Sequence, residues 1–311
     1  MDQKQVGERL MRVIFLGTGG AIPTLERSHP SIAVFFNGEY ILLDAGEGTQ
    51  KQIMKSGLGF ARLTRIFISH LHGDHFLGLF PLIQTLSLLR RKKRLEIYSP
   101  AGLRDVLHEL VSKAYLEPRF EVEVFEINED RSFDFGKYEV NMFHVFHGDT
   151  QTFGIRIKEA DKPGEFDVKK ANELGVPITM RGLLQKGMTI KTPSGRVVYP
   201  EDVLGPPKKG KLLVYSSDTR PCKAVVYNAK GADLLIHDAT FRDDLKDRAE
   251  KTGHSTVGEA CTIAMKAGVK KLALTHFSAR YKDKDLDKIE KEAKSLFSNA
   301  FVAKDLLSVN L

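Results

Sequence analysis

Ser69-His70-Leu71-His72-Gly73-Asp74-His75 contains four potential metal ligands within six residues, directly after the apolar strand pattern of residues 63–68. Alternation at the end of a strand points the first two histidines to one side, whereas the aspartate and the third histidine begin a helical run a turn away. This spacing favours two adjacent metal ions over one. A plain polar turn is the competing interpretation, but three imidazoles beside a carboxylate are costly to bury without metal.

The composition is that of a globular protein, and its charge favours an anionic partner. The chain has 311 residues, a formal charge of +7 and a pI near 9.2. This length permits one large domain or two smaller ones, and a basic surface alone is more often a solvated face than a binding site. Two cysteines make no disulfide framework, and no apolar run suits a signal peptide or a membrane span. We therefore expect a cytoplasmic protein without a membrane partner.

Strand and helix patterns alternate along the chain, which predicts an α/β sandwich rather than a helical bundle or an all-β barrel. Residues 1–10 carry no core pattern and are expected to be a frayed extension before the first strand at residues 12–16. Asn37-Gly38 is typical of a hairpin turn between the next two strands. Residues 76–89 are predicted to form one helix, and Thr49 is predicted to cap a short helix at residues 50–56.

Further potential ligands stand at the ends of later strands. His147 follows the strand pattern of residues 138–146, Asp218 follows that of residues 212–215, and His276 follows that of residues 271–274. His144 competes with His147, but the two face opposite sides of their strand and a glycine turn follows His147. Because sites in layered α/β proteins favour strand ends, we expect these residues to join the first cluster.

The composition changes between residues 158 and 210. These 53 residues hold six of the twelve prolines and seven glycines, with ten Lys or Arg against seven Asp or Glu. Long connections in compact domains are uncommon unless functional, so we interpret the segment as an inserted arm with a short helix at residues 168–174. A disordered linker between two domains is the alternative, which the resumed core strand at residues 212–215 disfavours. The expected organisation is one domain over residues 1–311 with an arm at residues 158–210.

These motifs, in this order, resemble the ligand motifs of the metallo-β-lactamase superfamily, and the match spans almost the whole chain. Asp44 resembles the aspartate of that superfamily's first motif, which supports the site without binding metal. Within the superfamily, the chain resembles the ribonuclease Z family of tRNA 3′-processing endonucleases. That resemblance rests on residues 15–19, 216–221, 237–240, 254–256 and 274–281, and on the arm motifs at residues 167–171 and 204–207.

The resemblance implies a four-layer αββα metallo-β-lactamase sandwich with an inserted exosite arm and two zinc ions per subunit. One ion would be held by His70, His72 and His147, the other by Asp74, His75 and His276, with Asp218 bridging them. Zinc lowers the pKa of bound water towards roughly 7, and a metal pair neutralises charge on phosphoryl oxygens. Asp74 would also accept a proton, His254 would protonate the departing ribose oxygen, and Asp238 would fix the His254 tautomer.

The resemblance also implies the substrate and the assembly. Precursor tRNA would lose its 3′ trailer, leaving a 3′-hydroxyl on the tRNA and a 5′-phosphate on the trailer, and the protein would be a homodimer. Two departures from the family pattern stand out, namely Asp238 where members commonly carry Glu, and residues 180–183 where a Gly-Pro step is frequent. The candidate substrate-binding residues are Lys169, Lys170, Arg181, Lys186 and Arg280.

Two other functions compete with this one. Another hydrolase of the superfamily, acting on a thioester, a lactam or a small cyclic phosphodiester, would share the same ligand set. His254, Asp238 and the basic arm argue against it, because a small substrate needs none of them. A non-catalytic nucleic-acid-binding relative is expected to have lost ligands, whereas all seven are present in this chain.

Overall fold

A computed structural model describes residues 11–36 and 38–311. The expectations for residues 1–10 and for the turn residue Asn37 therefore lie outside the described residues. The chain divides into a body, formed by Met1–Ile157 and Leu212–Leu311, and an arm unit, formed by Lys158–Lys211. The arm unit ends one residue after the segment singled out in the sequence, and its role in binding substrate stays a prediction.

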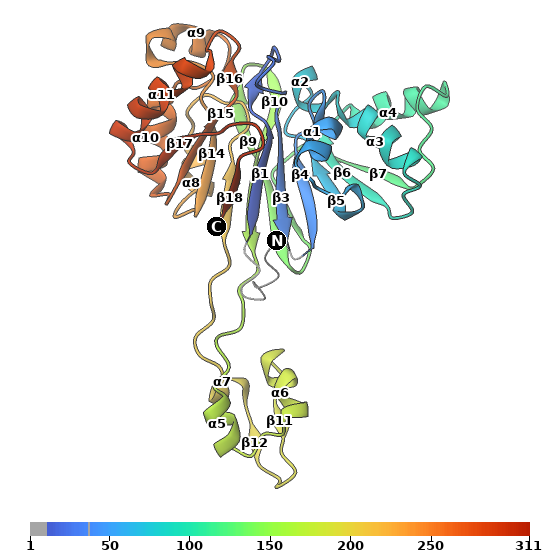
Figure 1. The fold of residues 1–311 in the computed structure, drawn as a ribbon, viewed down its shortest axis with the longest axis vertical. Helices are drawn as coiled ribbons and strands as arrows, with labels where there is room; N and C mark the ends of the chain where they lie inside the picture. The colour runs from blue at the N-terminus through green and yellow to red at the C-terminus, as the bar shows by residue number, and fades with distance from the viewer. Residues whose placement is uncertain (1–10, 37) are drawn as a thin grey trace. The chain divides into compact units, whose positions relative to one another are not determined.

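Two seven-stranded sheets pack face to face in the body (Figure 1). In the first sheet, β1, β3, β4 and β18 are joined by antiparallel pairings, and β4 to β7 by parallel ones. Its spatial order is β18 (Ser308–Asn310), β1 (Arg12–Gly17), β3 (Ser31–Phe36), β4 (Glu39–Leu43), β5 (Leu63–Phe67), β6 (Leu95–Pro100) and β7 (Val122–Ile127).

The second sheet is also mixed, with parallel pairings that join β13, β14, β15 and β17 and an antiparallel pairing of β8 with β9. A short parallel pair, β2 (Gly19–Gly20) with β16 (Phe277–Ser278), lies beside the site described below. The order of the second sheet is β17 (Ala300–Val302), β15 (Leu272–Thr275), β14 (Leu234–Asp238), β13 (Leu212–Tyr215), β10 (Thr150–Glu159), β9 (Tyr138–His147) and β8 (Arg131–Asp134).

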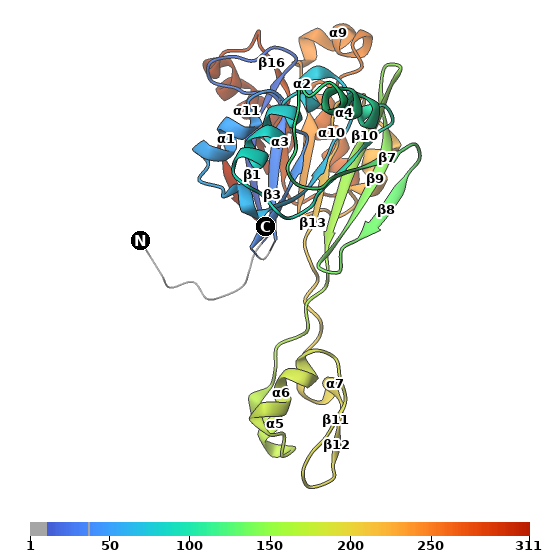
Figure 2. The ribbon, with the colours of Figure 1, turned by 90° about the vertical axis from the view of Figure 1, so that its right-hand side faces the viewer.

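Helices cover the outer faces of both sheets. Against the first sheet pack α1 (Thr49–Lys55), α3 (Leu79–Leu88) and α4 (Leu103–Ser112), which face the viewer in Figure 2. Against the second pack α8 (Lys223–Asn228), α10 (Val257–Ala267) and α11 (Asp283–Leu296). The shorter helical segments are α2 (Gly73–Phe76), α9 (Lys246–Lys251), η1 (Phe60–Arg62) and η2 (Asp243–Leu245).

The apolar strand runs of the sequence are explained by burial on both faces. Along β1, Val13 and Phe15 belong to the core between the sheets, whereas Ile14 and Leu16 belong to the core under the helices. Because a strand sends successive side chains to opposite faces, a strand covered on both sides needs a continuous apolar run. The predicted four-layer αββα sandwich is confirmed.

Two local predictions are wrong. The helix expected at residues 76–89 is interrupted, with α2 ending at Phe76 and α3 beginning at Leu79. A Cβ at the intervening Gly78 would lie 1.8 Å from the carbonyl oxygen of Gly46, so this close approach requires glycine. Thr49 is also not a cap, because its hydroxyl donates back to the Gly46 carbonyl at 2.7 Å and the helix already begins at this residue.

The arm unit has a small core of its own, formed by six buried apolar residues. Asp167 caps its first helix by accepting a hydrogen bond from the Lys170 N–H at 2.9 Å. This helix begins at the predicted residue and ends one residue before its predicted end. Its elements are α5 (Val168–Glu173), α6 (Ile178–Gln185), β11 (Ile190–Lys191), β12 (Val197–Val198) and α7 (Pro200–Val203). The core residues are Ala171, Val176, Leu184, Ile190, Val198 and Val203.

Within the described chain, no helix has both the length and the hydropathy that a membrane span requires.

The aromatic cluster between the sheets provides a test of this packing. Phe67 is fully buried, and its ring stacks on that of Tyr98 at 4.7 Å. Phe67→Ala should lower the free energy of unfolding by about 3–5 kcal/mol, because it removes a large core side chain and leaves a cavity. Leu25→Ala, at a fully exposed position, should change it by less than about 0.5 kcal/mol. Urea denaturation measures both, and equal values would contradict this packing.

Candidate metal centre

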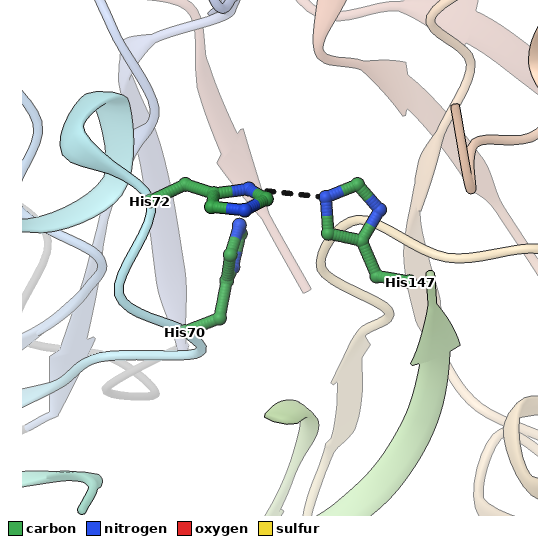
Figure 3. A group of neighbouring side chains, drawn as sticks. All are labelled: His70, His72 and His147. Atoms are coloured by element: carbon green, nitrogen blue, oxygen red, sulfur yellow. Dashed lines mark hydrogen bonds between the residues drawn. The ribbon is translucent and has the colours of Figure 1, made fainter. Parts of the chain in front are cut away.

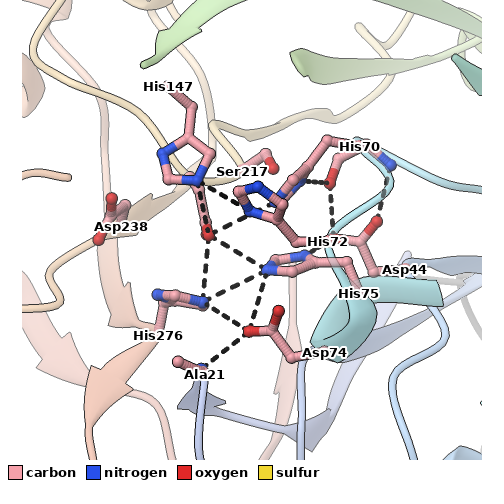
Figure 4. Close-up of polar contacts among 12 residues, drawn as sticks. Ala21, Asp44, His70, His72, Asp74, His75, His147, Ser217, Asp238 and His276 are labelled. Carbon is pink, nitrogen blue, oxygen red and sulfur yellow. Dashed lines mark hydrogen bonds and ion pairs between the residues drawn. The ribbon is translucent and has the colours of Figure 1, made fainter. Parts of the chain in front are cut away.

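The predicted ligands gather where strands of both sheets end (Figure 4). Strand ends are where side chains of different strands converge in layered α/β proteins. Residues from the first sheet follow β4 and β5 or open α2, and residues from the second follow β9, β13 and β15. The convergent side chains are Asp44, His70, His72, Asp74, His75, His147, Asp218 and His276.

One group consists of His70, His72 and His147 (Figure 3). Nε2 of His147 lies 3.1 Å from Nδ1 of His72, and the rings of His70 and His72 are 4.7 Å apart. The two residues from the end of β5 therefore point towards the histidine at the end of β9. His70 is fully buried, and its Nε2 has no hydrogen-bond partner in the protein.

A second group consists of Asp74, His75 and His276. Nε2 of His276 lies 3.3 Å from Nε2 of His75 and 3.4 Å from Oδ2 of Asp74. The opening of α2 thus meets the end of β15, although the two segments are 200 residues apart in the sequence.

Asp218 lies between the two groups. Its Oδ2 is 3.2 Å from Nε2 of His75 and 3.2 Å from Nε2 of His276, on the side of the second group. The same atom is 3.7 Å from Nε2 of His70 and 3.9 Å from Nε2 of His147, on the side of the first group. Its Oδ1 is buried without a hydrogen-bond partner in the protein.

The contacts among these residues suit bound metal ions better than they suit mutual hydrogen bonds. Imidazole nitrogens that face each other at 3.1 and 3.3 Å are poorly satisfied by mutual hydrogen bonds, and two buried acceptor or donor atoms have no protein partner. Imidazole nitrogen and carboxylate oxygen are the ligands that zinc takes in hydrolytic sites. The cluster is therefore a His/Asp metal-binding cluster.

Asp44 supports this cluster and fixes the orientation of His75. Its carboxylate accepts hydrogen bonds from the Ser69 N–H at 2.7 Å, the Ser69 hydroxyl at 2.9 Å and the Tyr215 hydroxyl at 2.8 Å, and lies 2.8 Å from Nδ1 of His75. Bonding Nδ1 in this way leaves Nε2 of His75 free to face the centre. Although burial favours the neutral imidazole, the charges of Asp218 and Asp44 raise the pKa of His75 well above its usual value.

Comparisons with known proteins agree with this architecture. A model of the β-lactamase superfamily domain matches residues 202–277, and one described as anti-Pycsar protein Apyc1 matches residues 11–163. Ribonuclease Z of Methanosarcina acetivorans is 42% identical over 303 residues, which cover 97% of this chain and 98% of that protein. Ribonuclease Z of Archaeoglobus fulgidus is 42% identical over 305 residues, with the same coverage. The crystal structure of the short form of human tRNase Z has a TM-score of 0.70 at 30% identity, covering 96% of this chain and 98% of that one.

The chain belongs to the ribonuclease Z family. The resemblance seen in the sequence is confirmed at both levels, the metallo-β-lactamase superfamily and the ribonuclease Z family within it. The protein is thus a metallohydrolase of the ribonuclease Z type.

The chain also has a paired histidine and carboxylate beside the metal-binding cluster, in which Asp238 is buried and His254 is partly exposed. Nδ1 of His254 lies 3.0 Å from Oδ2 of Asp238, so the aspartate reaches its partner although it is shorter than the glutamate common in the family. The ring of His254 is 4.7 Å from that of His147 and 5.1 Å from that of His276. Asp238 is held in turn by the N–H and hydroxyl of Thr240, at 2.9 and 2.7 Å.

Two supporting residues were missed in the sequence. Tyr215, whose hydroxyl reaches Asp44 across the two sheets, ends an otherwise apolar strand. A buried tyrosine hydroxyl needs a partner, and that signal was available in the sequence. Thr240, whose hydroxyl lies 2.8 Å from Nδ1 of His276, carried no such signal, because threonine is common at turns.

The remaining candidates lie elsewhere. His144 is half-exposed and pairs with Asp130 at 2.7 Å, so only His147 of the two points into the cluster. Arg280 belongs to the body, with its guanidinium 5.2 Å from the ring of Phe241. The other four substrate-binding candidates, Lys169, Lys170, Arg181 and Lys186, belong to the arm unit.

Gly20 offers a test of how tightly the cluster is supported. A Cβ at this position would lie 2.5 Å from the ring of His276 and 2.8 Å from its carbonyl oxygen. Gly20→Ala should therefore displace His276 and weaken zinc binding by about 10–100-fold, as changes beside metal ligands commonly do. Gly59→Ala is the matched control, since nothing lies within 4 Å of its Cβ. Zinc affinity is measured by competition with a chelating dye, and equal affinities would contradict the tight fit.

Proposed function

We propose that this chain is a zinc-dependent endoribonuclease that removes the 3′ trailer from precursor tRNA. The reaction leaves a 3′-hydroxyl on the tRNA and a 5′-phosphate on the trailer. The observation that carries the proposal is the His254–Asp238 pair beside two histidine groups that share the Asp218 carboxylate. The names of the relatives, ribonuclease Z and tRNase Z, support tRNA as the substrate.

The proposed cofactor is two Zn²⁺ per subunit. His70, His72 and His147 would hold one ion, Asp74, His75 and His276 the other, and Asp218 would contact both. When bound, the pair supplies positive charge for the phosphoryl oxygens and lowers the pKa of water to about 7. The distances within each group and from each group to Asp218 support this division.

The proposed second role of Asp74 is to accept a proton in its ionised form. Although burial favours its neutral form, the hydrogen bond from His276 and the charge of His75 hold the pKa of Asp74 well below its usual value. The carboxylate therefore stays ionised at working pH. The N–H of Ala21 donates to its Oδ2 at 2.8 Å, which holds this oxygen at the centre.

The proposed role of His254 is to donate a proton. Burial alone would lower its pKa, but the charge and hydrogen bond of Asp238 outweigh this effect and raise the pKa of His254 to about 9. The imidazole is therefore protonated at neutral pH, which is the form a general acid needs. Because the Asp238 carboxylate accepts the hydrogen bond from Nδ1–H, the Nε2–H would protonate the departing ribose oxygen.

The arm unit would bind the folded tRNA away from the cut. Lys169, Lys170, Arg181 and Lys186 are its proposed contacts, and Arg280 is the proposed contact on the body. Cationic side chains bind phosphates in a sequence-independent way, which suits recognition of many tRNAs by shape. The proposed assembly is a homodimer.

Cleavage of a 3′-extended tRNA transcript tests the activity directly. The zinc-loaded chain should release the trailer in one cut, and end mapping should find a 3′-hydroxyl on the tRNA fragment. Removal of zinc with a chelator should abolish cleavage, and its return should restore it. A chain that hydrolyses thioesters or small phosphodiesters but leaves the transcript intact would refute the proposal.

Deletion of residues 158–210 separates the arm's role from the chemistry. Processing of precursor tRNA should fall by at least about 100-fold in kcat/KM, whereas hydrolysis of a small phosphodiester should change little, because the metal-binding cluster belongs to the body. Equal losses on both substrates would remove the arm from substrate binding.

The pH profile tests the His254–Asp238 pair. Because the acid form is active, the rate should fall as pH rises through the His254 pKa of about 9. Asp238→Asn removes the charge that raises this pKa, so the alkaline fall should move to lower pH. His254→Ala should keep its zinc and lose about 100-fold or more in kcat. If the rate of Asp238→Asn falls at the same alkaline pH as the rate of the wild type, the proposed role of the pair is contradicted.

A further inference from the structure

A groove of about 610 Å³ lies between α8 and α10, the helices that cover the second sheet. α8 and the residues after it contribute Lys223, Val226, Tyr227 and Lys230, at spacings of three, four and seven. The three residues on α8 share one face of the helix, and Lys230 lies in the turn after it; all four line the groove. α10 contributes Lys266 to the opposite wall.

The groove is electropositive. Among the described residues, its lining includes three lysines and no Asp or Glu. Lys223, Lys230 and Lys266 are exposed, and none has an ion-pair partner within the described chain. Glu259, which precedes the groove on α10, is neutralised by the Arg220 guanidinium through two contacts of 2.8 Å. The charge of the three lysines is therefore available to an anionic ligand.

The groove also has aromatic and apolar surface. Tyr227 is 82% exposed, so its side chain is accessible to a ligand. Beside it, the side chains of Val226 and Ile263 contribute apolar lining. Lysines along a groove together with an exposed aromatic ring are the combination that binds single-stranded nucleic acid, since the phosphates meet the lysines and a base stacks on the ring.

One residue that lines the groove lies close to the metal-binding cluster. Pro221 is three residues after Asp218, a separation of at most about 11 Å along an extended chain. The intervening Arg220 donates its N–H to the Phe146 carbonyl at 2.7 Å, and its guanidinium donates to the His254 carbonyl at 2.5 Å. Phe146 is itself 67% exposed and precedes His147. The chain from Asp218 to Pro221 thus connects the centre to the residues that line the groove.

We propose that the groove between α8 and α10 binds the single-stranded 3′ trailer of the precursor, downstream of the cut. This inference rests on the proposed function, because a strand cut at the cluster must continue away from it. Three unpaired lysines and Tyr227 offer such a strand phosphate contacts and one stacking surface. A base-paired segment would leave the ring unused, since its bases are already stacked on one another.

Kinetics on two precursors test the groove. The variant Lys223→Glu/Lys230→Glu/Lys266→Glu is compared with Lys284→Glu/Lys288→Glu/Lys291→Glu, a matched charge change on α11 at exposed lysines. For a precursor with an unstructured trailer of about a dozen nucleotides, the groove variant should raise KM at least about tenfold. For a precursor with a single trailing nucleotide, both variants should stay within about threefold of the wild type.

The salt dependence and the ring give independent readouts. Loss of three phosphate contacts should reduce the slope of log affinity against log salt by about 2 for the long trailer, at about 0.7 per contact. Tyr227→Phe should behave like the wild type, whereas Tyr227→Ala should weaken binding of the long trailer. A Tyr227→Ala chain with unchanged affinity would overturn the stacking role.

Photo-crosslinking with the wild-type chain does not depend on how a variant folds. A 4-thiouridine in the trailer should cross-link to α8, and one placed upstream of the cut should not. A cross-link from the upstream label to α8, or equal losses for both trailer lengths in the groove variant, would overturn the groove while leaving the proposed function intact. If the wild-type chain cuts neither precursor, the proposed function fails and the groove with it.

Discussion

One carboxylate oxygen, Oδ2 of Asp218, has four histidine nitrogens within 3.9 Å, two from each group of the cluster. Its burial would favour the neutral form, but the charges of His276 and His75 hold the pKa of Asp218 well below its usual value. Such a charge is tolerated in the interior only when cations or protonated imidazoles surround it. The two sheets, the short helix α2 and the loop after β15 all converge on this oxygen, so the ends of the strands are arranged around a single electrostatic requirement.

Three residues of the cluster and its supports have a backbone conformation that non-glycine residues rarely adopt. Asp44, Ser217 and His276 all have positive φ, at 60°, 56° and 65°. Each follows a strand that leads into the cluster, and the left-handed turn redirects the chain there. A non-glycine residue in this region costs of order 1–3 kcal/mol. Hydrogen bonds and packing around these turns, such as the four contacts to the Asp44 carboxylate, offset that cost.

The sequence predicted the layers and the converging residues better than it predicted the local interruptions. Apolar runs and strand-end histidines are periodic or positional signals, so the sandwich and the members of the cluster were accessible from them. The break at Gly78 was not, because it depends on the backbone of Gly46, more than 30 residues away. The Thr240 hydroxyl beside His276 was inaccessible for the same reason, since it depends on which loops the fold brings together. Roles within the cluster, and the function of the arm unit, came from resemblance rather than from periodicity.

The hydrogen bond from Tyr215 to Asp44 joins the second sheet to the first at the level of the cluster. Asp44 orients His75, and the chain beyond Tyr215 carries Asp218, so this bond connects the supports of both sides. Each group of the cluster takes residues from both sheets, so the spacing between the sheets is also the spacing across each group. Side chains packed between the sheets, far from any reacting atom, set this spacing. Evolution can consequently adjust the reactivity of such a centre by exchanging core residues of slightly different volume, with every ligand left in place.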